Sequence, residues 1–303
     1  MANRIDDELT VFTVGGGDDA AAPVRGRAVR LPHALQTALA DRYPTEVARL
    51  LGEAMIIGAL VARSLKFDGR LVVQCHGTNE GAVSLLMADC TTDGHIRGYA
   101  RYDETALKSV LLDNRNPGAN ALLGGGTFSM TIDQGAHTDL YQGLAEIKGR
   151  DLSDSAEHFF EQSDQIPTFM RLAVGQDVGP DGPMWSGGGL MIQRVAEDEA
   201  RGATDDVFQT AKTLMSTVEP AELIDPDLPM DRLLYRLFNE DGVRTLDRHP
   251  VLAECRCSRD RLENTLRSFD DGARQDMADE DGLIRARCEF CDEEFVFLVT
   301  EIS

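Results

Sequence analysis

The sequence predicts an α+β protein with a mostly antiparallel sheet in its N-terminal core domain, a helical linker, and a small C-terminal module. Three observations predict this. Short apolar or β-branched runs, broken by Gly and Asn, recur between residues 70 and 195. Proline-punctuated helical patterns follow up to residue 239, and four of the six cysteines lie after residue 250. We therefore expect domains over residues 1–198, 199–250 and 251–303.

The core domain is expected to contain one long helix followed by a series of strands. The helix begins near Thr45 behind Pro44 and runs to about Leu65, with a broad apolar face. A shorter helix starts near Ser153, where Glu157 is placed to complete its N-terminal cap. Runs with strand-like composition or alternation cover residues 70–76, 82–89, 95–102, 128–133, 141–148, 168–174 and 188–195.

The linker is expected to pack on a neighbouring domain and to have no core of its own. A polar stretch over residues 197–206 favours a boundary there. Helices are predicted over residues 206–218 and 230–239, separated by three prolines. The second of these helices has an apolar face, formed by Leu233, Leu234, Leu237 and Phe238.

Composition limits the range of partners. The net charge is −22, so the surface repels phosphates, and we expect no nucleic acid and no anionic membrane as partner. The glycine run 124–126 lacks the following helix and lysine of a phosphate loop, so no nucleotide is expected. The apolar stretch 47–65 is short and interrupted by charges, and the first 19 residues have no apolar signal region. These features predict a cytoplasmic protein.

The last four cysteines form the strongest chemical signal, in the pattern Cys255-x-Cys257 and Cys288-x-x-Cys291. Thirty residues separate the two pairs. Thiolates about 2.3 Å from a metal suit tetrahedral zinc. A segment of about fifty residues is near the lower limit for a stable metal-free core. Structural zinc contributes about 10–16 kcal/mol of apparent binding free energy, which here becomes folding free energy. We therefore predict one Zn²⁺ per chain, bound when the thiols are reduced.

The C-x-C spacing also suggests redox chemistry. It permits a small disulfide ring, which cannot coexist with zinc because sulfurs around zinc lie about 3.7 Å apart, against about 2.05 Å in a disulfide. The alternative is a permanent structural zinc ribbon. Residues 251–303 carry 14 acids against seven arginines, which disfavours a nucleic-acid ribbon. Spacing and charge leave structural zinc and redox switch equally open. Cys75 and Cys90 fall in or beside strands and are predicted to be small core residues.

The sequence resembles the redox-regulated 33-kDa heat-shock chaperone family over nearly its full length. The module segments PVLAECRCSRDRLENTL and IRARCEFC are similar to the family's zinc module. Core landmarks are FDGRLVVQ, IRGYAR, LYQGLAEIKG, FFEQSDQIPT and SGGGLMIQ, and LLYRLFNEDGVR resembles the linker helix. The acids at 292–294 depart from the family, since a glycine-containing turn is expected after Cys291.

The resemblance implies an ATP-independent holdase that is inactive while reduced and zinc-bound. It implies that oxidation releases zinc and joins Cys255 to Cys257 and Cys288 to Cys291. The module and linker then unfold, and dimers hold unfolded client proteins. No catalytic residues are implied, so the protein is not expected to be an enzyme.

Two other classes of protein are weighed against this interpretation. A thiol-disulfide oxidoreductase needs a low-pKa cysteine beside cations, whereas acids flank Cys291 and no βαβ pattern precedes it. A constitutive zinc-bearing interaction protein would keep the same cysteines but would not respond to oxidant.

Overall fold

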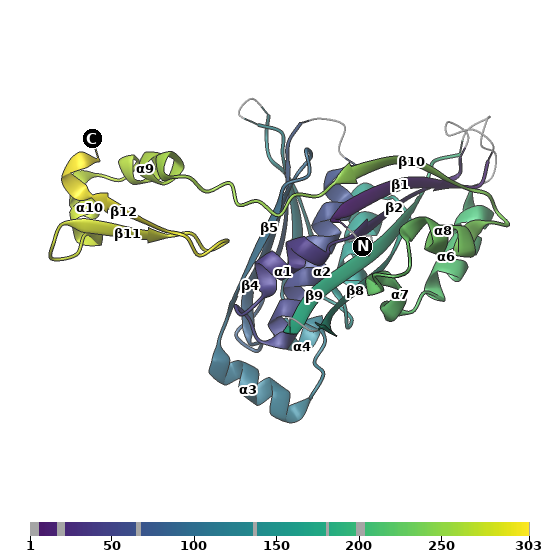
Figure 1. Cartoon of the computed structure of the whole chain (residues 1–303), viewed down its shortest axis with the longest axis horizontal. Helices are drawn as coiled ribbons and strands as arrows, with labels where there is room; N and C mark the ends of the chain where they lie inside the picture. The colour runs from purple at the N-terminus through teal and green to yellow at the C-terminus, as the bar shows by residue number, and fades with distance from the viewer. Residues whose placement is uncertain are drawn as a thin grey trace. The chain divides into compact units, whose positions relative to one another are not determined.

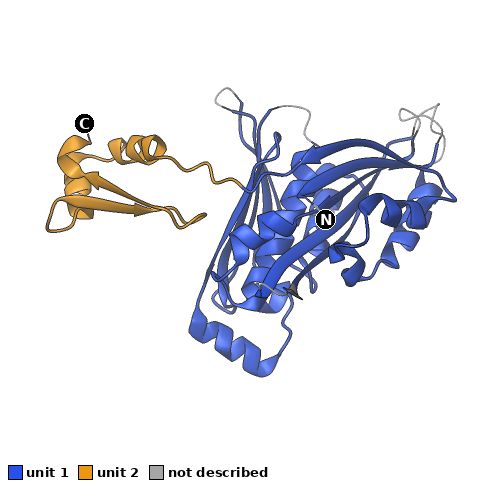
Figure 2. Ribbon diagram, in the orientation of Figure 1, with its two compact units in different colours: residues 1–253 blue, residues 254–303 orange. Residues whose placement is uncertain are grey.

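The computed structural model describes residues 6–16, 22–64, 68–135, 138–179, 182–197 and 204–302. The chain forms two compact units, residues 1–253 and residues 254–303 (Figure 2). The domain boundary predicted at residues 198–199 lies outside the described residues. The described part of the predicted linker, residues 204–250, belongs to the larger unit.

The larger unit contains two five-stranded sheets in which every described pair of neighbouring strands is antiparallel. The α+β fold class with antiparallel sheets is therefore confirmed. The first sheet has the order β10 (Val243–Pro250), β1 (Glu8–Val14), β2 (Val24–Arg30), β9 (Gly182–Arg194) and β8 (Thr168–Gly179). The second has the order β5 (Ile96–Tyr102), β4 (Val83–Thr91), β3 (Arg70–His76), β6 (Thr127–Asp133) and β7 (Tyr141–Glu146).

Helix α2 (Thr45–Ala62) is the centre of the larger unit. It contacts β3, β4 and β5 of the second sheet and β2, β8 and β9 of the first, so it lies between the two sheets (Figure 1). A helix that is apolar all round is one that is buried all round, and Val47 to Ala62 are buried apart from Arg49. Among the described residues, no helix combines the length and apolarity that crossing a bilayer requires.

Close approach between α2 and the first sheet depends on glycine. A Cβ at Gly189 of β9 would lie 2.5 Å from Cγ2 of Ile56, and one at Gly187 would lie 3.0 Å from Cδ1 of the same side chain. The glycine run therefore lets an isoleucine of α2 sit directly on the strand backbone. Helix α1 (Pro32–Leu39) packs beside α2 on β9.

The remaining helices of this part are short. They are α3 (Glu104–Asp113), α4 (Ala119–Leu123), α5 (Leu152–Phe159) and the π-helical turn η2 (Phe160–Asp164). The capping role predicted for Glu157 in α5 is wrong: its Oε1 accepts a hydrogen bond from the Met170 amide of β8, at 2.7 Å. A tertiary partner far along the chain has replaced the local one.

Helices α6 (Asp205–Ser216), α7 (Pro220–Ile224) and α8 (Met230–Phe238) pack on the face of the first sheet opposite to α2. The predicted apolar face of the linker, Leu233, Leu234, Leu237 and Phe238, is buried there. These side chains share a core with strand residues of the sheet, namely Phe12, Val14, Val24, Ala28, Leu190 and Ile192. The first sheet is thus covered on both faces.

No strand was predicted in the linker, but its last residues, 243–250, form β10 and pair with β1. The local sequence, VRTLDRHP, has no regular apolar alternation and ends in proline. Its strand conformation is set by the open edge of β1, whose residues lie more than 220 positions earlier in the sequence, and local patterning cannot reveal it.

The smaller unit contains α9 (Arg259–Arg267), α10 (Asp271–Met277), the hairpin β11 (Leu283–Arg287) with β12 (Glu294–Leu298), and the turn η3 (Val299–Glu301). Its core has four buried side chains, Leu266, Ile284, Phe297 and Ile302. That is a very small core for fifty residues.

Truncating a side chain in the α2 layer should destabilise the whole larger unit. We expect Ile56→Ala to lower the free energy of unfolding by about 2–5 kcal/mol, because Ile56 is fully buried and its removal leaves a cavity. The measurement is urea denaturation of the reduced protein. Leu112→Ala is the control, because Leu112 is 87% exposed and should cost almost nothing. Equal effects of the two substitutions would contradict the sandwiched position of α2.

A carboxyl group is buried in the same helix. Glu53 accepts a hydrogen bond from the Leu152 amide at 3.0 Å and pairs with Arg49, also at 3.0 Å. Burial raises the pKa of Glu53 from 4.5 to about 7, against the opposing effect of the Arg49 guanidinium. The folded protein therefore holds this proton more tightly than the unfolded chain does.

The stability that Glu53 contributes is present below pH 4.5 and is lost as the pH rises through about 7. In Glu53→Gln, the amide oxygen can still accept from Leu152, but no proton is released. We expect the decline of unfolding free energy between these pH values to become shallower, by at most about 1.4 kcal/mol per pH unit. Denaturation curves across this range measure the slope. Glu146→Gln, at an exposed position, should keep the original slope, and an unchanged slope in Glu53→Gln would refute the assignment.

Candidate metal centre

The first cysteine pair lies in the extended segment that leads into α9. Ser258, directly after Cys257, caps this helix by accepting a hydrogen bond from the Arg261 amide at 3.3 Å. The guanidinium of Arg261 donates to the carbonyl of Arg256, the residue between the two cysteines, at 2.8 Å. The start of α9 therefore fixes the backbone that carries Cys255 and Cys257.

The second pair lies in the turn of the β11–β12 hairpin. The Cys288 amide donates to the Glu293 carbonyl at 2.9 Å, and the Asp292 amide donates back to the Cys288 carbonyl at 2.8 Å. Asp292 has a φ of 68°, which favours glycine but which aspartate also adopts. It also pairs with Arg287 across the turn. The glycine expected in this turn is therefore replaced by an aspartate in the left-handed conformation.

Helix α9 and the hairpin are joined by Arg259. Its Nη1 donates to the Val296 carbonyl at 2.9 Å, and its guanidinium lies 4.5 Å from the centre of the Phe297 ring. Leu266 of α9 packs with Phe297 in the small core. These contacts bring together two cysteine pairs that thirty residues separate.

All four sulfurs converge. The Sγ atoms of Cys255, Cys257, Cys288 and Cys291 lie within 4.8 Å of one another. The Sγ atoms of Cys255 and Cys288 are 3.7 Å apart, and those of Cys257 and Cys291 are 3.3 Å apart. Sulfurs around tetrahedral zinc lie about 3.7 Å apart, so this cluster has the size that a zinc ion requires. The four residues that the sequence suggested as ligands are thus brought together.

The electrostatics of the cluster also suit a cation. Burial, followed by hydrogen bonding with the Cys291 and Cys255 thiols, raises the pKa of Cys257. Glu293 adds a carboxylate oxygen 3.7 Å from the Cys257 sulfur. Four neighbouring thiols do not ionise together unless a dication compensates their charge, and a coordinating thiol is then deprotonated outright. The donor set fits a soft divalent ion such as Zn²⁺.

Cys75 and Cys90 are separate from this cluster. Both are buried in the second sheet, on β3 and β4, which confirms that they are core residues. Burial raises the pKa of the Cys75 thiol, which therefore stays protonated.

Sequence reasoning missed three residues that shape the site, namely Ser258, Arg259 and Asp292. The serine before a helical run is a recognisable cap signal. Arg259 acts through contacts with β12, which no local pattern reveals, whereas Asp292, noted in the sequence only as an acid where a glycine-containing turn is expected, acts within its own hairpin turn.

The fold and the site define a two-unit α+β protein with a four-thiol centre in its small unit. The family model described as Hsp33 protein matches residues 9–298, so this chain belongs to the Hsp33 protein family. The resemblance found in the sequence is confirmed.

The 33 kDa chaperonin of Caulobacter vibrioides is 46% identical over 288 residues, covering 95% of this chain and 93% of the relative. That of Pseudomonas savastanoi pv. phaseolicola is 34% identical, covering 92% and 88%. The crystal structure of the 33 kDa chaperonin from Thermotoga maritima superposes with a TM-score of 0.74 at 20% identity. It covers 97% of this chain and 96% of that chain, and it shows the same fold.

Replacing any ligand should remove the metal and unfold the smaller unit. In Cys288→Ser we expect zinc content to fall from about one ion per chain to near zero, since a closed site needs four ligands. Hydrogen exchange should then accelerate over residues 254–302 while β3 and β4 remain protected. Elemental analysis measures the zinc. Cys75→Ala/Cys90→Ala is the matched control and should keep its zinc. Loss of zinc in the control would overturn the ligand assignment.

Proposed function

We propose that this protein is a redox-regulated, ATP-independent holdase chaperone, inactive when reduced and zinc-bound and activated by oxidation. The observation that carries the proposal is the convergence of four thiols in a unit whose described residues form an apolar core of only four buried side chains. Cys255, Cys257, Cys288 and Cys291 would hold the zinc ion. Its role is structural, and it would stabilise the module by neutralising four thiolates.

Oxidation and metal binding exclude each other at this site. A disulfide needs sulfurs about 2.05 Å apart, and four thiolates around zinc cannot approach so closely. Forming each disulfide removes two electrons from a pair of thiolates. Hydrogen peroxide accepts these electrons with two protons and becomes two waters. The disulfide sulfurs of Cys255, Cys257, Cys288 and Cys291 would carry no negative charge, so these residues could no longer hold a zinc ion.

We assign the disulfides to Cys255–Cys257 and Cys288–Cys291. All four sulfurs are within reach of one another while the module is folded. As the thiols are oxidised and the module opens, pairs of cysteines close in sequence would form a disulfide more readily, because closing a thirty-residue loop costs more entropy. The pairs adjacent in sequence are therefore favoured at that stage.

Unfolding of the module would pass along the chain into the linker. Only Glu254 separates Cys255 from Ala253, which packs against the core of the larger unit. When α8 leaves the first sheet, Leu233, Leu234, Leu237 and Phe238 expose an apolar face, and so does the sheet beneath. Exposed apolar surface of this kind binds unfolded chains.

The protein's partners would be unfolded client proteins in the cytoplasm, and the oxidised form would be a homodimer. The net charge of −22 would keep the activated form soluble while its apolar surface is exposed. A constitutive zinc protein would have the same fold and the same cysteines, and only the response to oxidant distinguishes the two.

Oxidation should turn an inert protein into a client-binding one. We expect protein treated with peroxide under mild heat to suppress light scattering by a heat-denatured client at near-stoichiometric amounts, with zinc release in parallel, because losing zinc removes folding free energy comparable to the stability of a domain. A zinc-sensitive dye and light scattering follow the two events. Reductant with zinc should reverse the effect, and ATP should change nothing. Equal protection by reduced, zinc-loaded protein would establish the constitutive alternative.

A further inference from the structure

Strand β10 closes one edge of the first sheet but is weakly held. It is the outermost strand and pairs with β1 from Glu8↔Pro250 to Val14↔Val243. None of its eight side chains is buried, and five are exposed. Backbone pairing with β1 is therefore joined by only a few side-chain contacts: Val243 packs at the margin of the core beneath α8, and Nδ1 of His249 lies 2.6 Å from Nη2 of Arg63.

Two further features weaken this strand. The register with β1 shifts between Val11 and Phe12, so Leu246 has no partner in the ladder. Arg248 pairs with Glu8 at 3.4 Å and with Asp231, but all three side chains are about half exposed. Ion pairs at such positions contribute little.

Strand β1 is held far more firmly. Leu9 belongs to the core that contains α2, while Phe12 and Val14 belong to the core beneath α6 and α8. These three side chains are fully buried. The two neighbours of β1 differ accordingly: β2 continues the sheet, whereas β10 only covers its edge. If β10 and α8 departed, the packing of Leu9 in the core around α2 and the pairing with β2 would still hold β1, and its other edge, rich in β-branched residues, would be open.

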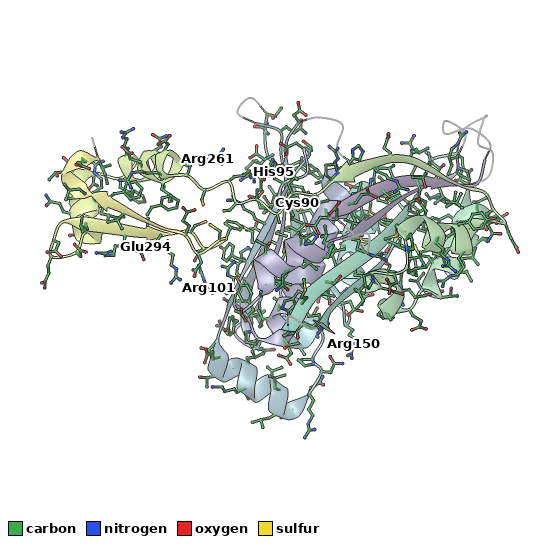
Figure 3. All side chains as sticks on the ribbon, in the orientation of Figure 1. Cys90, His95, Arg101, Arg150, Arg261 and Glu294 are labelled. Carbon is green, nitrogen blue, oxygen red and sulfur yellow. The ribbon has the colours of Figure 1, made fainter. Side chains whose placement is uncertain are left out.

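The chain after β10 forms a short strap that ends next to the cysteines. The Val251 amide donates to the Asp7 carbonyl, and the Leu252 amide donates to the Gly94 carbonyl, both at 2.9 Å. The Leu252 carbonyl accepts from the Ile96 amide at 2.9 Å, beside His95, which Figure 3 labels. Cys255 follows three residues after Leu252. In the sequence, β10 therefore lies between α8, which precedes it, and this strap, which follows it.

We propose that the β1 edge is a client-binding site: after β10 is released, an extended segment of an unfolded polypeptide takes its place by antiparallel backbone pairing. This rests on the proposed function, since it needs the linker to unfold. Strand β10 itself shows what kind of occupant the edge accepts, because an extended segment of this length already pairs with seven residues of β1. Exposed strand edges are ready templates for pairing with another chain.

This binding mode suits a holdase. Strand addition draws its affinity from main-chain hydrogen bonds, so it requires no particular client sequence. The charged and proline-ending sequence of β10 makes it a poor competitor for a client rich in β-branched residues. Once zinc restores the module, the strap and α8 bring β10 back to the edge at high effective concentration, and the client is displaced.

Hydrogen exchange can follow the edge directly. The probe is a reduced and alkylated, permanently unfolded protein. Amides of β1 should be protected in the reduced chaperone, exchange faster after oxidation, and be protected again when the unfolded protein is added. Amides of β9, in the middle of the sheet, should stay protected throughout. Protection of β1 that returns on oxidation alone and grows with chaperone concentration would mean that a second copy takes the edge, and would overturn the proposal.

A variant that strengthens β10 provides the second test. Asp247→Val raises β propensity at an exposed position opposite Val11. If β10 occupies the client's edge, this substitution should weaken client binding by the oxidised form roughly fivefold, with unchanged zinc release. Glu146→Val is the matched control, an exposed acid on the outermost strand β7 of the other sheet, and should bind clients as before.

The outcomes separate the two proposals. If apolar surface alone captured clients, the added valine would leave binding unchanged or increase it, and the edge proposal would be wrong while the holdase remained. If β1 stays protected during client binding without ever exchanging faster, β10 never leaves and the edge proposal again fails. If oxidised wild-type protein does not hold clients at all, the proposed function itself fails.

Discussion

The shortage of apolar core in residues 254–303 is the constraint on which the proposed switch depends. Four buried side chains cannot offset the conformational entropy of ordering fifty residues. Arg259, the Ser258 cap and the hairpin turn bring the chain's four sulfurs together, and a cation bound among them, as proposed, would supply the missing free energy. A module built in this way can be dismantled by chemistry at its thiols alone.

The larger unit, by contrast, has an extensive apolar core of its own. Helix α2 is buried between two sheets, and its side chains form one continuous apolar core with side chains from both sheets. Nothing in that core involves the four-thiol cluster, so the two sheets can persist when the module is lost. The helices α6 to α8 and strand β10 are intermediate in how firmly they are held. They cover one face and one edge of the first sheet, whose strands also pack against α2 on the opposite face.

Sequence reasoning succeeded where a signal is local. The burial of α2 followed from an apolar run with a proline start, and β3 was predicted at its observed bounds, Arg70–His76, from its β-branched composition. It failed where partners are distant. The strands β1 and β2 were not predicted at all, although they form the middle of the first sheet together with β9. The division into two sheets was not foreseen either, because strand composition does not specify which strands pair.

The sequence by itself determined the chemistry that the site can offer: residue type and spacing single out four cysteine sulfurs that could hold a metal ion. Only the tertiary structure decided that Asp292 would turn the hairpin, that Arg259 would tie α9 to it, and that a charged segment such as β10 would become a strand. The reason is physical. Ligand chemistry belongs to individual side chains, whereas an edge, a buried face or a pairing register exists only once distant segments have come together.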